Sequence, residues 1–67
     1  MAVARVTEIS STSSKSFEDA IQQGVSRATK TLRNVKGAWI KEQRVDIDGE
    51  VIVQYQVNLM VTFVLDD

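Results

Sequence analysis

Residues 14–36, which read SKSFEDAIQQGVSRATKTLRNVK, decide the fold of this chain. Apolar and small residues recur in this stretch at the i, i+3, i+4, i+7 spacing of one helical face: Phe17, Ala20, Ile21, Gly24, Val25, Ala28, Leu32 and Val35. The pattern predicts one amphipathic helix from about Ser14 to Lys36. Such a helix cannot bury its apolar face alone, so the rest of the chain must supply a surface that covers it.

The two ends of this helix carry their own signals. The serine and threonine run at residues 10–14 predicts a loop whose last members cap the free backbone N–H groups of the first turn. Glu18 and Asp19 stand near the start, and basic residues follow towards the end: Arg27, Lys30, Arg33 and Lys36. This order complements the helix dipole, and Gly37 is expected to end the helix.

Strands are expected on both sides of the helix. Residues 2–9 are rich in β-branched side chains and predict a first strand. In a second strand, residues 38–47, the apolar positions change parity between Lys41 and Arg44, which indicates a β-bulge. A strand curved in this way would turn Trp39 away from the helix.

The last strand, residues 51–65, is the clearest, because every odd position in it is apolar. Its odd-numbered residues from Val53 to Phe63 are expected to lie against the helix. It follows Asp48-Gly49, a dipeptide typical of tight hairpin turns. Fifteen extended residues reach about 50 Å. A helix of some 23 residues spans only about 35 Å. The last strand should therefore extend beyond the helix and either curl or cover surface in another subunit.

The order of these elements predicts an α+β fold of the type β-α-β-β. A right-handed crossover would place the first two strands parallel, and the hairpin would insert the third between them. The result is a three-stranded, antiparallel-type sheet of order 1-3-2, curved around one amphipathic helix. Its two edge strands invite pairing between subunits, since the chain has no proline to block them.

Composition limits the class of protein. Sixty-seven residues, 43% hydrophobic and 25% charged, indicate one small globular domain spanning residues 1–67. Cysteine and histidine are absent, so disulfides and the usual zinc sites are excluded and oligomerisation becomes the expected extra stabiliser. A net charge of −1 offers no field for nucleic acid. No membrane-spanning or signal-like stretch is present, and a cytoplasmic location is expected.

An enzyme is the weakest functional class for this sequence. It has no phosphate loop, no metal-ligand cluster and no nucleophile with a partner base. The acidic pairs Glu18-Asp19 and Asp66-Asp67 can be interpreted as ligands of a hard cation, but exposed pairs are more often solvated charges. No catalytic residue and no metal site are therefore predicted.

Three stretches carry a resemblance to a known family: residues 12–17 (TSSKSF), residues 30–35 (KTLRNV) and Tyr55-Gln56-Val57. With the order β-α-β-β, nearly the whole chain resembles a dodecin. The resemblance implies a curved antiparallel sheet wrapped around one helix, with twelve copies forming a hollow shell. It also implies a flavin (FMN, riboflavin or FAD) stacked in pairs between tryptophans at subunit axes, and a role in flavin storage or sequestration.

The resemblance assigns roles to three polar residues. Gln56 matches the glutamine whose amide pairs with the flavin ring edge, and its even number places it on the face away from the helix. The alternative is a glutamine packed in a subunit interface. Glu42 matches an acidic position near the flavin side chain, and Arg44 matches an arginine near bound phosphate in some bacterial members. The alternative for both is a solvated charge, because charged residues on a curved strand are more often solvated than they are ligands. Val64 replaces an arginine that some members carry.

Tryptophan departs from the family pattern. Flavin-binding members carry a Trp-x-Glu-Val arrangement after the helix, and alignment puts Gly37 at the tryptophan position and Trp39 at the glutamate position. Trp39 keeps the parity but is displaced by two residues, about 6.6 Å along the strand. It either stacks on a flavin or fills the subunit interface and closes the site. The second alternative describes a dodecin-like shell with a structural, cargo-binding or ion-binding role.

Overall fold

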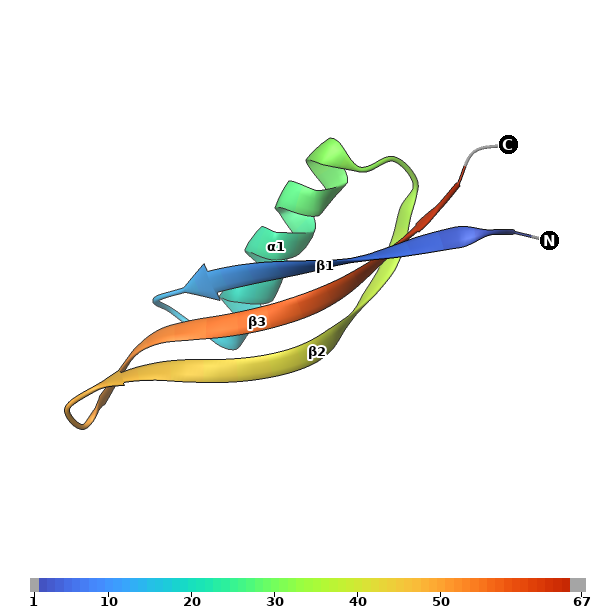
Figure 1. Cartoon of the computed structure of the whole chain (residues 1–67). Coiled ribbons are helices and arrows are strands. Elements are labelled where there is room, and N and C mark those ends of the chain that lie inside the picture. The colour runs from blue at the N-terminus through green and yellow to red at the C-terminus, as the bar shows by residue number, and fades with distance from the viewer. Residues whose placement is uncertain (1, 66–67) are drawn as a thin grey trace.

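The structure is a computed structural model that describes residues 2–65. Its elements are β1 (Ala4–Ser13), α1 (Phe17–Thr31), β2 (Val35–Asp48) and β3 (Val51–Val64). The three strands form one sheet of order β1-β3-β2 that curves past α1 (Figure 1). Both outer strands run antiparallel to β3, so they are parallel to each other. The predicted fold class and strand order are confirmed.

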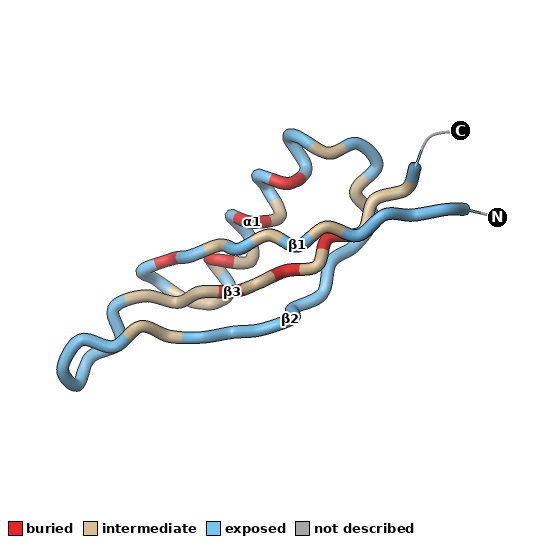
Figure 2. Tube along the Cα trace, in the orientation of Figure 1, coloured by how far each residue is buried: buried red, intermediate tan, exposed pale blue. Residues whose placement is uncertain are grey.

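The core lies between α1 and the inner face of β3. Its buried apolar residues are Ala20, Ala28, Val57, Leu59 and Val61. Figure 2 shows these buried positions along one side of α1 and at alternate residues of β3. Half-buried side chains surround them: Ile9, Phe17, Ile21, Val25, Leu32 and Val35. The helix face predicted from the apolar spacing therefore packs on the odd positions of β3, as expected.

The serine-rich stretch is a strand, which corrects the predicted loop. Residues 10–13 continue β1, where Ser10 pairs with Asn58 and Ser13 with Tyr55. Small side chains are required here because the helix lies close: a Cβ added at Gly24 would be 3.1 Å from the Cβ of Ser11. Serine is a poor strand former, so the register with β3 outweighs its local preference for loops.

Side chains before and after the turn between β1 and α1 fix the start of the helix. The N-cap is Ser16, not one of residues 10–14 as predicted, and its Oγ accepts a hydrogen bond of 3.0 Å from the Asp19 amide. Asp19 in turn accepts hydrogen bonds of 2.6 Å from the buried Ser13 hydroxyl and 2.6 Å from Gln23 Nε2. The Asp19 carboxylate thus links the end of β1 to the first turns of the helix.

The helix ends earlier than the apolar spacing predicts. Thr31 is its last residue, and Leu32 is already extended although its N–H bonds to the Ala28 carbonyl at 2.9 Å. Asn34 follows with φ 60°, a left-handed conformation that asparagine tolerates. Val35 lies outside the helix and pairs with Phe63 in the sheet. The last apolar residue of the predicted helix face is therefore a strand residue. Gly37 is consequently a strand residue and does not end the helix.

Bulges curve β2 and the hairpin. Lys41 is unpaired between Ile40, opposite Leu59, and Glu42, opposite Asn58, which confirms the predicted bulge. Two further register shifts lie between Val35 and Gly37 and between Asp46 and Ile47. Each bulge adds twist, so the sheet bends around the helix.

The loop of the β2–β3 hairpin is Gly49-Glu50, one residue later than the predicted Asp48-Gly49. Asp48 still pairs with Val51, and Gly49 adopts φ 65° at the first position of a two-residue loop. A glycine at this position fits a type II′ turn. Val53 lies at the adjacent register shift and is exposed, which corrects its predicted place against the helix.

The molecule is elongated and has a thin core. Its 15-residue helix spans about 22 Å. The 14 residues of β3 reach about 46 Å, so the predicted extension beyond the helix is confirmed. The overall extents are 51 × 19 × 13 Å and the radius of gyration is 13.9 Å. A compact chain of this length would have about 11 Å. Within residues 2–65, no helix is long and apolar enough to cross a membrane.

Replacing Leu59 with Asp tests the assignment of the inner face. A carboxylate without a partner in this core costs more than the roughly 5–15 kcal/mol by which domains are stable, so the variant should unfold or disassemble. Thr29→Asp places the same charge on the exposed side of α1 and should keep the native melting temperature within a few degrees. A Leu59→Asp protein with native circular dichroism and native mass would show that the face is wrongly assigned.

Acid should weaken the start of α1. The Ser13 hydrogen bond, the Gln23 hydrogen bond and the nearby Lys15 charge hold the pKa of Asp19 below its ordinary value of 3.8. A carboxylate with a lowered pKa in the folded state stabilises fully above the ordinary pKa, and this contribution is lost as the pH falls through the folded-state pKa. Ser13→Ala should therefore reduce the loss of stability between pH 5 and pH 2 in urea titrations. Glu18→Gln, at an exposed neighbouring position, is the control and should leave that loss nearly unchanged.

Candidate functional site

The four residues singled out from the sequence all lie on the outer face of the sheet, away from α1. The register places Trp39 opposite Met60, Glu42 opposite Asn58 and Arg44 opposite Gln56. The β3 partners are even-numbered and point away from the core because side chains alternate along a strand. The faces predicted by parity for Trp39 and Gln56 are therefore correct.

Gln56 is held in place by its neighbours on this face. Its side-chain Nε2 donates to Ser10 Oγ at 3.1 Å and to Asn58 Oδ1 at 3.3 Å. Both amide hydrogens are thus directed along the sheet, whereas the carbonyl oxygen has two lone pairs for an outside donor. Ser10 belongs to the last part of β1, residues 10–13, which the sequence had predicted to be a loop, so this support was not foreseen.

Glu42, Arg44 and Gln56 line one small hollow with Gln43 and Asn58. Its volume is about 40 Å³, which is close to the roughly 30 Å³ that a single water occupies in the liquid. Arg44 Nη2 also contacts Asp46 Oδ1 at 3.0 Å, with 67% of the Arg44 side chain and 39% of the Asp46 side chain exposed. An exposed pair of this kind contributes about 0–1 kcal/mol, so Arg44 is free to turn towards another anion.

Trp39 lies outside this hollow. Its side chain is 52% exposed, and its partner Met60 is four residues from Gln56, about 13 Å along β3. Between them, Lys41 Nζ reaches across the face to Glu8 Oε1 at 3.1 Å. One chain therefore presents an aromatic surface and an amide on the same face but does not enclose a ligand between them.

Gly37 stands two residues before Trp39 on this face, opposite Thr62. A Cβ added there would have no heavy atom within 4 Å, and its φ lies outside the left-handed region. Neither space nor backbone conformation requires glycine at this position. The departure from a tryptophan here thus leaves an open patch on the outer face.

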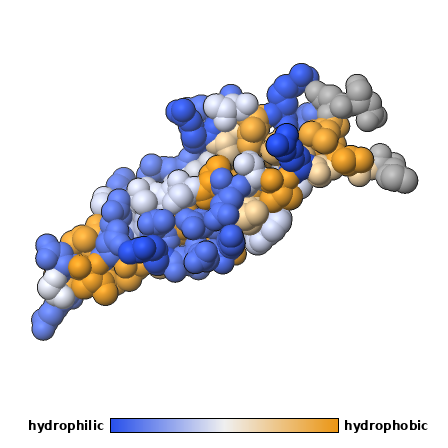
Figure 3. Space-filling view, viewed as in Figure 1, coloured by the Kyte–Doolittle hydropathy of each residue, from blue (hydrophilic) through white to orange (hydrophobic). Residues whose placement is uncertain are grey.

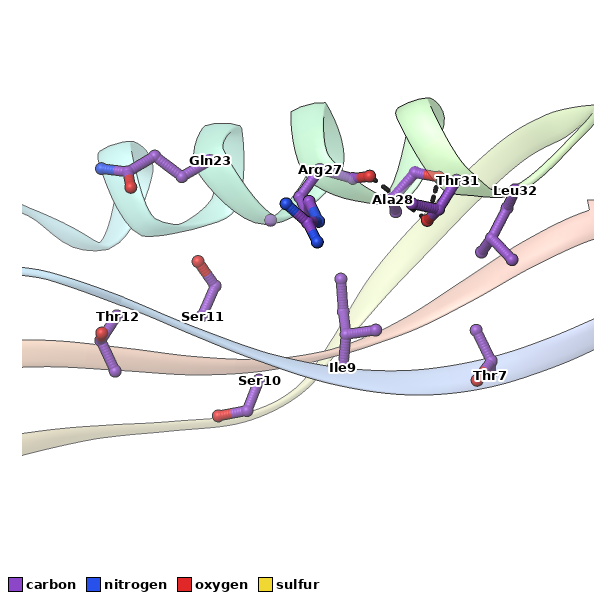
Figure 4. A pocket seen from close by; sticks show the side chains of 11 residues that line it. Thr7, Ile9, Ser10, Ser11, Thr12, Gln23, Arg27, Ala28, Thr31 and Leu32 are labelled. Atoms are coloured by element: carbon purple, nitrogen blue, oxygen red, sulfur yellow. Dashed lines mark hydrogen bonds between the residues drawn. The ribbon is translucent and has the colours of Figure 1, made fainter.

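A larger cavity is on the other side of the sheet, between α1 and β1. Its volume is about 590 Å³. We term it the α1–β1 groove. Figure 4 shows Arg27 and Thr31 from the helix and Ser11 and Ile9 from the strand around the same space. The groove is lined by Thr7, Ile9, Ser10, Ser11, Thr12, Gln23, Gly24, Arg27, Ala28, Thr31 and Leu32.

The sequence reading did not identify the α1–β1 groove. The available signal was the pairing of small Gly24 and Ala28 on the helix with short Ser11 on the neighbouring strand, which leaves space beside the core. A second, smaller cavity of about 210 Å³ lies between α1 and β2, against Val61. Among residues 2–65, no group of three His, Cys, Asp or Glu side chains is arranged to hold a metal ion.

Comparison with known sequences gives one consistent result. The family model described as Dodecin matches residues 3–66. A dodecin from Thermus thermophilus is 38% identical over 65 residues, which cover 97% of this chain and 94% of that protein.

Solved structures agree with the sequence comparison. A crystal structure of a Thermus thermophilus protein superposes with a TM-score of 0.92 at 37% identity, covering 100% of this chain and 98% of that one. A dodecin from Streptomyces davaonensis gives 0.91 at 35% identity, with 98% and 97% covered. A calcium dodecin from Mycobacterium tuberculosis, described with a calcium-binding site, gives 0.83 at 29% identity, with 97% and 93% covered.

Proposed function

This chain belongs to the dodecin family, and we propose that it forms a hollow homododecamer that binds and stores a flavin. One observation carries the proposal: Trp39 and Gln56, an exposed aromatic ring and a fixed amide, share the outer face of one sheet. Together they supply a stacking surface and a hydrogen-bonding edge for a planar heterocycle.

Assembly is supported by the shape of the single chain. It exposes 5019 Å², whereas a compact monomer of 7.5 kDa exposes about 4,200 Å². The surplus includes apolar side chains at both ends of the molecule, among them Val3, Leu65, Ile47 and Val51. A subunit with so thin a core gains stability when partners cover this surface.

The ligand site would be completed by a neighbouring subunit. The hollow beside Gln56 holds about one water, so a flavin cannot enter it and must lie across the open outer face. A second copy placed over that face would supply the other wall. Trp39 would then stack on the ring system, and the Gln56 carbonyl would accept from a ring N–H.

Glu42 and Arg44 are proposed to contact the polar side chain of the flavin. Arg44 suits a phosphate because a guanidinium binds two oxygens side by side, and its exposed Asp46 contact costs little to exchange. This assignment favours FMN over riboflavin. FAD also carries phosphate and stays among the candidates.

The competing function is a shell in which Trp39 closes the flavin site. It is favoured by Gly37, which stands where flavin-binding members carry tryptophan. In that case Trp39 is an interface residue and the particle holds a structural, cargo or ion-binding role. Both functions are non-enzymatic, and a cytoplasmic location stays a prediction from the sequence.

Fluorescence titration of FMN with the native protein tests the flavin proposal. Indole in face contact quenches flavin emission, so native protein should quench it. Trp39→Ala should lower affinity by about 1–3 kcal/mol, as for a base stacked on an aromatic side chain. Gln56→Ala should lower it by about 0.5–1.5 kcal/mol, the net value of a neutral hydrogen bond.

Light scattering on the same samples supplies the control. Native protein and both variants should have the mass of twelve chains. If native protein does not quench and Trp39→Ala breaks the assembly, Trp39 is interface packing and the closed shell is correct. A native mass of one or two chains would show that the proposed dodecamer does not form.

Moving the tryptophan provides a gain-of-function test. The double variant Gly37→Trp/Trp39→Glu recreates the Trp-x-Glu arrangement, and the open space at Gly37 accepts the new side chain within this chain. We expect FMN affinity to rise about tenfold or more, because the ring returns to the family position and a stacking contact is worth about 1–3 kcal/mol. Gly37→Ala/Trp39→Glu is the matched control and should bind FMN more weakly than native protein.

A further inference from the structure

The far end of the β2–β3 hairpin has no covering layer in its own chain. β1 ends opposite Tyr55, so the segment of β3 before it pairs only with β2. The apolar side chains of this end are exposed: Ile47 by 63%, Val51 by 62%, Ile52 by 47% and Val53 by 47%. Figure 3 shows a hydrophobic patch beside a hydrophilic tip at this end of the molecule. A two-stranded ribbon with such side chains is marginal in water unless it packs against another surface.

The tip of this hairpin is acidic. Asp48 and Glu50 flank the turn glycine and are exposed. Asp46 is the next acidic residue along β2, and it is already paired with Arg44. The ribbon therefore presents apolar side chains along its length and free carboxylates at its end. A surface that receives it needs an apolar floor and a positive charge.

The α1–β1 groove has both properties. Ile9, Ala28 and Leu32 supply apolar surface inside it, and Arg27 extends into it from the helix (Figure 4). Arg27 forms no side-chain hydrogen bond or ion pair with another residue in the range 2–65. From residue 20 to its end at Thr31 the helix carries two basic residues, Arg27 and Lys30, and no acidic one, so the helix side of the groove is positively charged.

We propose that the β2–β3 hairpin tip of one subunit inserts into the α1–β1 groove of a second copy of this chain. The inference rests on the proposed oligomer and names one of its contacts. Ile47 and Ile52, which lie opposite each other in the ribbon, would fill the apolar part of the groove, and Glu50 would meet Arg27. The contact joins two different surfaces, so it is heterologous, and in a closed oligomer it would repeat around a ring of subunits.

Two other arrangements of the tip are disfavoured by charge. Tips that met each other around an axis would bring Asp48 and Glu50 against their own copies, and like charges in contact weaken association. The opposite end of the molecule is also apolar, with Val3 and Leu65 exposed. The sequence there continues into two aspartates, which would repel an acidic tip.

Charge exchange tests the pairing of Glu50 with Arg27. Glu50→Arg and Arg27→Glu should each raise the protein concentration at half dissociation about tenfold or more, as measured by light scattering over a dilution series. The double variant Glu50→Arg/Arg27→Glu should return to within a few-fold of native. Lys30 is an exposed helix residue outside the groove, so Glu50→Arg/Lys30→Glu should show no such recovery and serves as the control.

Engineered disulfides give an independent readout, because the chain contains no cysteine. Ile52→Cys and Thr31→Cys are made as separate variants and assembled together from denatured chains. Oxidation should produce dimers that join one chain of each kind, which differ in size when one variant carries a tag. These bonds form only where the two Cα atoms come within about 4.4–6.8 Å.

The possible results separate this inference from the proposed function. Mixed dimers and charge recovery at a mass of twelve chains support the contact. Homodimers of Ile52→Cys alone would instead show tips meeting each other and would overturn it. A native mass of twelve chains with neither mixed dimers nor charge recovery overturns the contact but leaves the dodecamer intact. A monomeric native protein refutes both.

Discussion

The close approach of the helix to the sheet is the constraint on which the rest of this structure depends. A Cβ at Gly24 would lie 3.0 Å from Leu59 Cδ1, so the helix backbone rests almost directly on the central strand. Ala20 and Ala28 extend this flat contact along the helix. Short side chains on β1 follow from the same constraint, because a larger residue at Ser11 would push the helix away. The core is therefore tight but small.

Much of the fold could be predicted because period and parity are local properties of a sequence. The alternation along β3 identified its buried face, and the parity change near Lys41 identified the bulge that bends β2. The serine run and the end of the helix could not be predicted in the same way. Residues 10–13 form a strand through pairing with β3, and Val35 changes from helix to strand because Phe63 lies beside it. Such contacts join residues distant in sequence.

The candidate site shows a similar division. Parity alone placed Trp39 and Gln56 on one face, but the anchoring of Gln56 by Ser10 depended on a strand that local preference did not reveal. The hollow next to Gln56 is also small, so the proposed function needs a neighbouring chain to complete the site. No single-chain pattern in a sequence describes a wall contributed by a neighbouring molecule. The residues of such a site are therefore predictable, whereas its shape is not.

Alternation along β3 also has an evolutionary consequence. Odd residues such as Leu59 hold the helix, while even residues such as Gln56 and Asn58 face outward, so the two sets meet different selective demands. Mutations that alter what the outer face recognises leave the inner packing untouched. A lineage can thus drift from one bound molecule to another through a series of folded intermediates. Trp39 belongs to this second, outward-facing set, because it lies on the outer face and contributes to no part of the core.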